Sequence, residues 1–468
     1  MERLMKTGVV KPKHSSEIHH SRIGIGFEKL DRDVFDPEKA YDKIANTGVK
    51  WVRIQSGWQK TEKVKGQYNF EWLDKIVDNL LKRGMKPWMC LCYGNQLYDD
   101  MAKTVFGAVG CPPIYTEEAR NAWSAYVSAL AEHFKGRIEY YEVWNEPDGK
   151  WCWKNGVNAK EYGEFVIATA KAIRQADSSA KVVGGAVCHW DMHYLYEALM
   201  TGMKEHIDAI SYHMYTPKDI QRFERFYSIK GLCQALNLDV EIIQGESGSQ
   251  SRSDGAGALK GCSWTPRKQA KQLARQIMID LMTDVKFTSY FSSMDMIEAL
   301  NGIVGDKSSY LDYGYFGVLA ATFDEDGFAT GDYTPKMSYT TLQTICSVFA
   351  DDFTVTEFPV LPVQAESRRV FGRDMDTTSL IKGGFKKPNG SFALVYWNSC
   401  DLLTTEFEST ITFNIVGIPG KVQLVDLLTG TIYDIPESIM KETSSNCYIF
   451  ENLPVTDYPL LLTFGDFI

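Results

Sequence analysis

Two glutamates stand where apolar, strand-like runs of the sequence end. Glu146 follows the run 138–144, and Glu246 follows the run 239–244. Hydrolysis of an acetal requires a proton donor for the leaving oxygen and a carboxylate at the anomeric carbon. Two carboxyl groups supply both when their environments drive their pKa values apart. The pair therefore indicates cleavage of a glycosidic bond, where a separation of ~5–5.5 Å predicts retention and ~6.5–9.5 Å predicts inversion.

Other polar and aromatic side chains lie at or just after the ends of neighbouring runs, where they could line one pocket. Amides and carboxylates bond sugar hydroxyls, and aromatic rings stack on sugar faces. Glu28 has two equally supported interpretations, binding a hydroxyl or pairing with Arg53. Asp148 and Trp151 could form subsite walls or simply pack a surface loop. The candidates for substrate binding are Glu28, Arg53, Asn95, Asn145, Asp148, Trp151, Trp190, His213, Tyr215 and Gln244.

Eight apolar runs alternate with helical periodicity between residues 22 and 295. Such alternation indicates a parallel sheet, because each crossover between parallel strands needs a helix. Eight units predict an α/β fold of the (β/α)₈ TIM-barrel type, in which the carboxyl ends of the strands meet at one rim. A doubly wound open sheet is the alternative, but no GxGxxG or GxxxxGK[ST] motif follows the first run. We expect strands at 22–28, 49–55, 86–93, 138–144, 181–187, 207–213, 239–244 and 287–292.

The sequence pattern changes after about residue 300. A helix is expected at 335–350, and an alternating β pattern with turn signals follows from residue 353. We therefore expect a catalytic barrel over 21–350 and an antiparallel β-sandwich domain over 351–468. Residues 1–20 could pack on this β module, which also offers a surface for a homo-oligomer.

Composition and charge exclude several classes of protein. The 468 residues are 44% hydrophobic and carry a net charge of −10, which argues against a disordered chain and against a cationic face for nucleic acid. No apolar run is long enough to span a membrane. The first twenty residues lack the features of a secretory signal, which predicts a cytoplasmic protein with reduced cysteines. No metal-ligand array or cofactor motif stands out, so we expect neither a metal nor a cofactor.

The motifs around the two glutamates resemble those of a known group of enzymes. The segment Val143-Trp-Asn-Glu-Pro147 resembles the Asn-Glu-Pro signature of clan A glycoside hydrolases, the retaining "4/7" superfamily. Ile242-Ile-Gln-Gly-Glu246 resembles the end of that clan's strand seven, and Ile210-Ser-Tyr-His-Met-Tyr215 its strand six. Arg53 matches the arginine of strand two. The closest resemblance is to glycoside hydrolase family 39, followed by families 30 and 5.

The resemblance implies a role for each matching residue. Glu146 would be the acid/base, Glu246 the nucleophile, and Asn145 would bond the 2-hydroxyl of the sugar, while His213 and Tyr215 would orient the pair. One departure concerns strand eight, where many clan members place a tryptophan as a sugar platform. The sequence has Ser293-Met-Asp295 there, so either the platform comes from Trp151, Trp190 or Trp264, or the sugar sits differently.

The predicted function is a retaining glycoside hydrolase that cleaves β-linked, or equatorially equivalent, glycosides by double displacement. Long loops after several strands indicate a partly closed pocket and exo action on short oligosaccharides or plant glycosides. Two alternatives stay open. A non-catalytic carbohydrate-binding barrel would hold the two carboxyls far apart or tie them to Arg or Lys, and a transglycosylase would use the same pair but exclude water.

Overall fold

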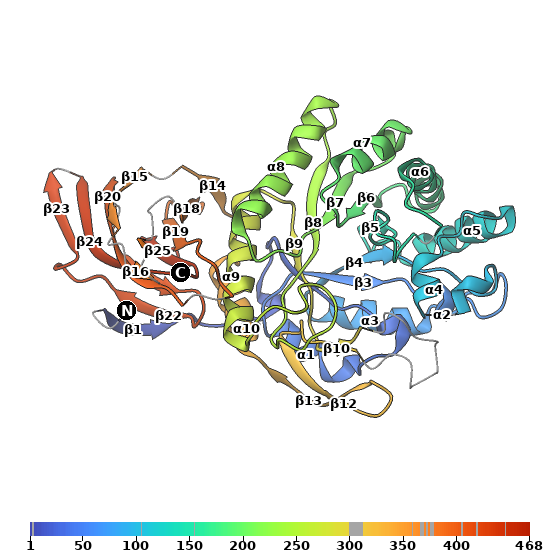
Figure 1. Ribbon diagram of the computed structural model, residues 1–468, viewed down its shortest axis with the longest axis horizontal. Coiled ribbons are helices and arrows are strands. Elements are labelled where there is room, and N and C mark those ends of the chain that lie inside the picture. Colours follow the sequence, from blue (N-terminus) through green and yellow to red (C-terminus); the bar gives the residue numbers. More distant parts are fainter. Residues whose placement is uncertain are drawn as a thin grey trace.

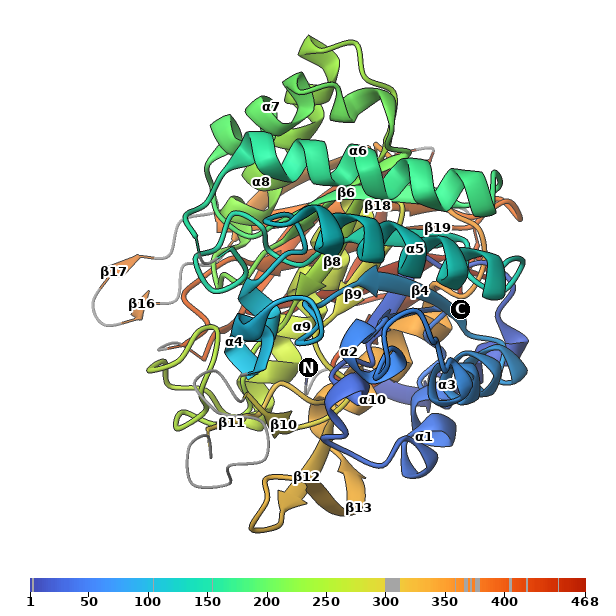
Figure 2. The same cartoon turned by 90° about the vertical axis from the view of Figure 1, so that its right-hand side faces the viewer.

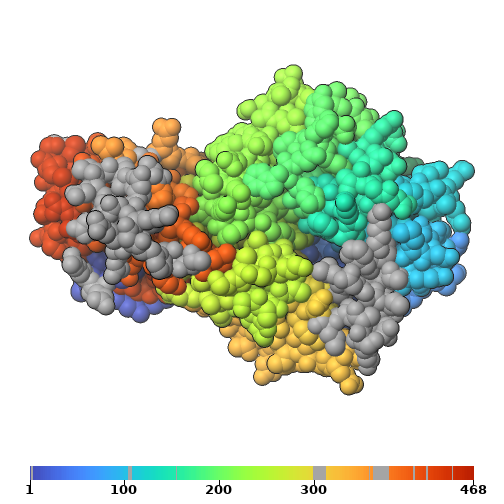
Figure 3. Space-filling view, viewed as in Figure 1, coloured from blue at the N-terminus to red at the C-terminus, as the bar shows by residue number. Residues whose placement is uncertain are grey.

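The computed structural model describes residues 1, 4–103, 105–153, 155–298, 312–357, 359–365, 369–370, 373–374, 379–403, 406–417, 420–444 and 446–468. Figures 1 and 3 show two modules side by side, one built from the first two thirds of the chain and one from its C-terminal strands. The strand β1 (Met5–Val9), near the N-terminus, lies in the second module.

Eight strands of the first module close into a barrel. Neighbouring strands pair in parallel around the whole circle, and the last strand pairs with the first. The strand ends lie within a few residues of those expected from the sequence. The barrel strands are β2 (Ile23–Gly26), β3 (Trp51–Gln55), β4 (Lys86–Leu91), β5 (Tyr140–Val143), β6 (Lys181–Val187), β7 (Ala209–His213), β8 (Glu241–Ser247) and β9 (Thr288–Tyr290).

Helices connect these strands and cover the outside of the barrel; in Figure 2, α5 and α6 cross in front of it. Several begin at side-chain caps, such as Thr116 before α5 and Thr265 before α9, where Pro266 at the first helical position forfeits no hydrogen bond. The helices are α1 (Tyr41–Ala45), α2 (Trp58–Thr61), α3 (Glu71–Lys82), α4 (Val105–Gly110), α5 (Glu117–His133), α6 (Ala159–Ala176), α7 (Met192–Met200), α8 (Asp219–Ala235), α9 (Pro266–Met282) and α10 (Met337–Val348).

The barrel interior is layered, because residues two apart on a strand face the same side. An aromatic layer closes the amino-terminal end of the barrel: Trp51 stacks on Phe287 with ring centroids 4.4 Å apart, and Trp88 and Tyr140 meet the same ring edge-on. Two residues further along their strands lie Arg53 and Glu142, which are fully buried. A polar layer thus rests on an aromatic one, directly below the carboxyl-terminal rim.

Short hairpins extend the barrel module after β9. The strand β10 (Met296–Ile297) pairs with β11 (Tyr313–Gly314), and β12 (Leu319–Phe323) pairs with β13 (Ala329–Pro335). The isolated pairing of Phe35 with Ala329 ties the second hairpin to the loop that follows β2.

The second module consists of antiparallel sheets that enclose their own apolar core. A seven-stranded sheet has the order β1-β22-β21-β25-β19-β18-β14, and a four-stranded sheet has the order β15-β20-β24-β23. Buried side chains of both sheets, among them Phe413 and Phe464, form one cluster. The predicted fold class, a barrel followed by a β-sandwich, is confirmed. The strands are β14 (Thr354–Thr356), β15 (Val360–Ala365), β16 (Arg369–Val370), β17 (Arg373–Asp374), β18 (Leu380–Lys386), β19 (Phe392–Asn398), β20 (Glu408–Val416), β21 (Val422–Asp426), β22 (Thr431–Asp434), β23 (Met440–Ser444), β24 (Cys447–Thr456) and β25 (Leu460–Phe464).

The two modules meet along α8 and α9 through buried polar contacts. Lys271 of α9 lies 2.8 Å from Asp457, and both side chains are 1% exposed. Arg275 donates to the carbonyl oxygens of Asn398, Cys400 and Asp457. Because α9 packs against both modules, this interface is a structural joint between them.

Among the described residues, no helix is long and apolar enough to cross a membrane.

This joint gives a stability prediction. Lys271→Met leaves the buried carboxylate of Asp457 without its nearest cation, so we expect the free energy of unfolding to fall by about 3 kcal/mol. Lys441→Met, which removes an ion pair to Glu451 that is 39–53% exposed, should cost less than about 1 kcal/mol. Urea unfolding followed by tryptophan fluorescence measures both. Equal losses would contradict the role given to the buried pair.

Candidate functional site

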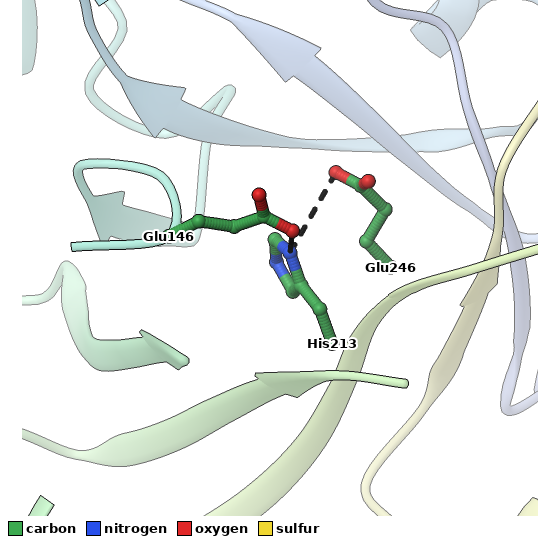
Figure 4. Close-up of side chains that lie close together, drawn as sticks. All are labelled: Glu146, His213 and Glu246. Carbon is green, nitrogen blue, oxygen red and sulfur yellow. Dashed lines mark hydrogen bonds and ion pairs between the residues drawn. The ribbon is translucent and has the colours of Figure 1, made fainter. Parts of the chain in front are cut away.

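Glu146 and Glu246 face each other at the carboxyl-terminal rim, with His213 beside them (Figure 4). One carboxylate oxygen of each glutamate and a ring nitrogen of His213 all lie within 4.8 Å of one another. His213 Nδ1 is 3.0 Å from Glu146 Oε1 and 3.8 Å from Glu246 Oε2. The side chains of both glutamates are 13% exposed, so part of each remains accessible. Their proximity corresponds to the short separation of a retaining pair rather than the long separation of an inverting pair.

Arg53 is the hub of the site. Its guanidinium donates to Glu246 Oε2 at 2.8 Å, to Glu28 Oε1 at 2.9 Å, and to Glu142 through Nε at 2.9 Å and Nη2 at 2.5 Å. It also donates to Asn145 Oδ1 at 2.8 Å. Burial lowers the pKa of Arg53, but Glu142 and Glu28 raise it further, so it stays charged. One cation therefore positions four side chains that come from three strands or their ends, β2, β5 and β8.

Tyr215 and His213 complete the surroundings of Glu246. The phenol of Tyr215 donates to Glu246 Oε1 at 2.5 Å, and burial together with the charge of Glu246 raises its pKa, so it stays a donor. Burial lowers the pKa of His213, but the charge of Glu246 and the hydrogen bond to Glu146 raise it to a greater extent. Glu246 thus sits among Tyr215, Arg53 and His213.

Glu28 shares Arg53 with two other carboxylates. It is 3% exposed, and burial raises its pKa to about 7 despite the guanidinium, with the charge of Glu246 adding to the rise. Three carboxylates around one guanidinium carry an excess of negative charge that a proton on Glu28 relieves. The ion pair with Arg53 is one of the two interpretations that the sequence left open for this residue.

Trp151 contacts the other glutamate from the loop after β5. Its indole Nε1 donates to Glu146 Oε2 at 2.6 Å, and its ring lies 5.4 Å from the ring of His189. Trp151 is 36% exposed, and Trp190, at the end of the neighbouring β6 loop, is 48% exposed. Aromatic surface therefore gathers on the Glu146 side of the pair, whereas Trp264 is buried and donates to the carbonyl oxygen of Leu259.

The remaining candidates from the sequence have structural partners. Asn95 donates to the carbonyl oxygen of Glu62 and accepts from Leu97 N, and Gln244 accepts from Thr288 Oγ1 inside the barrel wall. Asp148 accepts from the backbone N–H groups of Cys188 and His189, which joins the loops after β5 and β6. These hydrogen bonds keep the two loops together next to Trp151.

Strand eight ends earlier than the sequence suggested, and an aromatic ring does occupy its end. The strand β9 stops at Tyr290, and the next residue, Phe291, packs edge-on against Tyr215 with ring centroids 6.5 Å apart. Met294 is fully buried and Asp295 pairs with Lys336, so neither replaces a platform. Phe291 escaped sequence analysis because it extends an apolar run without a stop signal.

Glu142 is a second residue that sequence analysis missed. It is fully buried on β5 and accepts hydrogen bonds from the guanidinium of Arg53 and, at 2.6 Å, from Ser211 Oγ. Its position two residues after Tyr140 in an apolar strand was the available signal, since a charged side chain facing a barrel interior needs a partner. Gly245 makes room for this group, because a Cβ there would lie 3.1 Å from Glu142 Oε1.

The cluster of Glu146, His213 and Glu246 also has the donor set of a metal site. A metal ligand must be a neutral imidazole, whereas the charge of Glu246 favours the protonated form of His213. The guanidinium of Arg53 already lies 2.8 Å from Glu246 and would repel a divalent cation. The donor set therefore fits a metal poorly.

The raised pKa of Glu28 predicts how stability depends on pH. In the unfolded chain this carboxyl loses its proton near its ordinary pKa of 4.5, but in the fold it keeps the proton up to about pH 7. The folded state therefore binds more protons between these values, and stability falls as pH rises through them. Glu28→Gln should remove this contribution, so its unfolding free energy should rise relative to the parent between pH 5 and pH 7.5 in urea titrations. The exposed Glu118→Gln is the control, and a parallel pH dependence of parent and Glu28→Gln would refute the assignment.

Comparison with known proteins follows this geometry. Residues 34–235 match the family model described as glycosyl hydrolases family 39. The chain is 29% identical over 180 residues to a β-xylosidase of Geobacillus stearothermophilus, an alignment that covers 35% of this chain and 34% of that protein. It is 32% identical over 165 residues to a β-xylosidase of Caldicellulosiruptor saccharolyticus, covering 33% and 32%. The matched segments span about a third of the length of each relative.

The fold extends the likeness beyond the matched segment. A family 39 glycoside hydrolase from Bacteroides cellulosilyticus WH2 superposes with a TM-score of 0.65 at 16% identity, covering 95% of this chain and 81% of that one. At this identity the likeness establishes a shared fold. The resemblance inferred from the motifs is thus confirmed: in the sequence of its barrel and in its overall architecture, this chain is similar to the glycosyl hydrolases of family 39.

Proposed function

We propose that this protein is a retaining glycoside hydrolase, with Glu246 as nucleophile and Glu146 as acid/base. The observation that carries the proposal is the pair of carboxylates within 4.8 Å of each other and in different surroundings. Glu246 is held by a permanent cation and a phenol, which suits an anionic nucleophile. Glu146 has no contact with Arg53 among the described hydrogen bonds and ion pairs, which suits a group that gains and loses a proton.

The reaction would proceed in two displacements. In the first, a Glu246 oxygen forms a bond to the anomeric carbon while the bond to the leaving oxygen breaks, and Glu146 gives its proton to that oxygen. In the second, Glu146 takes a proton from water, the water oxygen bonds to the anomeric carbon, and Glu246 departs as a carboxylate. Two inversions restore the configuration of the anomeric carbon. Asn145, held by Arg53, would bond the 2-hydroxyl of the sugar.

The acid step places a demand on Trp151. An indole N–H can only donate, so Glu146 Oε2 cannot deliver a proton to the leaving oxygen while Trp151 occupies that direction. The partly exposed ring would move off Oε2 as the leaving group enters and would then offer its face to that group. This movement gives the ring a place on the leaving-group side of the site.

β-Xylosides are the first substrates to test. Two of the relatives are β-xylosidases, and a third, 26% identical over 149 residues, is a β-galactosidase of Clostridium cellulovorans. All three names refer to β-linked sugars, which agrees with the β-glycosides expected from the motifs. The neutral pocket chemistry of amides, carboxylates and aromatic rings suits such polyols.

The two alternatives make different demands on the site. A purely sugar-binding barrel would have its carboxyls tied up by a cation, and Arg53 does contact Glu246. That cation is shared among three carboxylates, however, and Glu246 keeps 13% of its side-chain surface exposed, so catalysis is favoured. A transglycosylase would use the same pair, and product analysis with an added sugar acceptor separates transfer from hydrolysis.

Removing the nucleophile provides the first test. Glu246→Ala should lower kcat on 4-nitrophenyl β-xyloside by more than about 10⁴-fold, because no covalent intermediate can form. Added azide should then restore turnover and yield a glycosyl azide of inverted configuration, identified by NMR. Turnover within tenfold of the parent would remove Glu246 from this role.

Removing the acid/base should produce a different pattern. Glu146→Ala should slow hydrolysis of a xyloside with a poor leaving group, such as a methyl glycoside, far more than that of a dinitrophenyl glycoside, whose leaving oxygen needs no proton. The expected difference between the two losses is about 10²-fold or more. Measurements of kcat/KM on both substrates decide the matter, and equal losses would argue against an acid role.

A further inference from the structure

A cavity of about 780 Å³ lies on the same rim of the barrel as the glutamate pair. Its walls come from the loops after β2, β3 and β4, and the hairpin β12–β13 contributes Asp324 and Phe328. This volume falls within the range of sites that hold small ligands. The cavity contains neither Glu146 nor Glu246 among its described lining residues, so it is a space additional to the site of the reaction.

The cavity borders the site at Lys29, Gln55 and Tyr93. Lys29, next in sequence to Glu28, lines the cavity, and its backbone N–H donates to Gln55 at the end of β3 at 3.0 Å. Gln55 in turn donates to the hydroxyl of Tyr93, another lining residue, at 3.2 Å. The ring of Tyr93 packs edge-on against Trp144, two residues before Glu146. A ligand in the cavity would therefore lie beside the sugar that Arg53 and Asn145 surround.

The lining has the chemistry of a sugar site. Three lining side chains carry hydrogen-bond donors that have no partner among the described residues: the Nζ of Lys63, the Nε2 of Gln59 and the side-chain amide of Gln96. The Oε1 of Gln59 accepts from the backbone N–H of Gln96. Four cationic and five acidic side chains appear among the described lining residues, so the charges nearly balance. Balanced charge with free hydrogen-bonding groups and a ring such as Phe328 fits a neutral polyol better than an anion.

The position of the cavity relative to the two glutamates assigns its side. The leaving group must lie against Glu146, where Trp151 and Trp190 expose their rings on the loops after β5 and β6. The cavity lies across the site, beyond Glu28 and Gln55, on the loops after β2 to β4. It therefore extends the half of the site that holds the sugar to be transferred to Glu246.

We propose that this cavity is a binding site for a second neutral sugar on the glycone side, so that the enzyme releases a disaccharide unit rather than only a terminal monosaccharide. This inference rests on the proposed function. It specifies the product of the exo action on short oligosaccharides that the long loops suggested, and it gives a role to the donors of Gln59, Lys63 and Gln96 that have no partner among the described residues.

The experiment compares two chromogenic probes with the full-length protein. We expect kcat/KM for 4-nitrophenyl β-xylobioside to exceed that for 4-nitrophenyl β-xyloside by about tenfold, the gain from one or two added hydrogen bonds. Chromatography should show xylobiose and nitrophenolate released together in equal amounts from the start of the reaction. Xylose as the first product, or a lower kcat/KM for the disaccharide probe, would overturn the proposal.

Variants connect the effect to the cavity. The double change Lys63→Ala and Gln96→Ala should remove most of the disaccharide advantage while leaving kcat/KM on the xyloside within twofold. Gln96→Trp, which fills the cavity, should do the same. Lys75→Ala, on the outer face of α3, is the matched control and should leave both values unchanged. Equal losses on both probes would refute a glycone-side site, and parental values for both probes in both cavity variants would do so too.

The failures of the two proposals are distinguishable. If the xyloside is hydrolysed through Glu246 but the disaccharide has no advantage, the proposed function stands and the second sugar site falls. If neither probe, nor the corresponding glucoside and cellobioside, is hydrolysed, the proposed function falls and the sugar site falls with it. Thermal unfolding of each variant establishes that the losses do not reflect misfolding.

Discussion

The charge of Arg53 is the constraint on which the site depends. A guanidinium buried in the middle of a barrel is costly unless its donors are satisfied, and here three carboxylates and an amide satisfy them. The same contacts fix the carboxylate of Glu246 and orient Asn145, so the stability of the barrel interior and the geometry of the site have a common cause. A change at Arg53 would therefore affect both the stability of the interior and the geometry of the site.

The layered interior explains why this cation can exist. The aromatic layer of Trp51, Trp88, Tyr140 and Phe287 closes the barrel below, and it excludes water from Arg53 and Glu142. In such surroundings each ion-pair contact is stronger than in water, and each missing one is more costly. Residues two apart on a strand face the same side, so Ser211 and His213 of β7 both face the barrel interior. His213 is the nearer of the two to the rim, where substrate could enter.

Local signals in the sequence were enough to predict the barrel and the glutamate pair. Each glutamate follows an apolar run, and in a parallel barrel all such ends meet, so Glu146 and Glu246 could be brought together without knowing any contact. Contacts between distant residues could not be anticipated in this way. Glu142 meets Arg53 across 89 positions of the chain, and nothing near either residue reports the distance between them. Phe291 was missed for a different reason, because an apolar run without a stop signal hides the end of its strand.

The placement of α9 has a further consequence. Thirteen of its residues, from Gln269 to Leu281, are buried, which is unusual for an outer helix of a barrel and reflects its position under the second module. Several of these buried side chains are polar: Lys271 pairs with Asp457 of the second module, and Arg275 donates to carbonyl oxygens of that module besides pairing with Asp219 of α8. The sandwich therefore covers one flank of the barrel as part of its structure, and it cannot be exchanged freely for another domain. If another domain replaced the sandwich, the sequence of α9 would have to change with it.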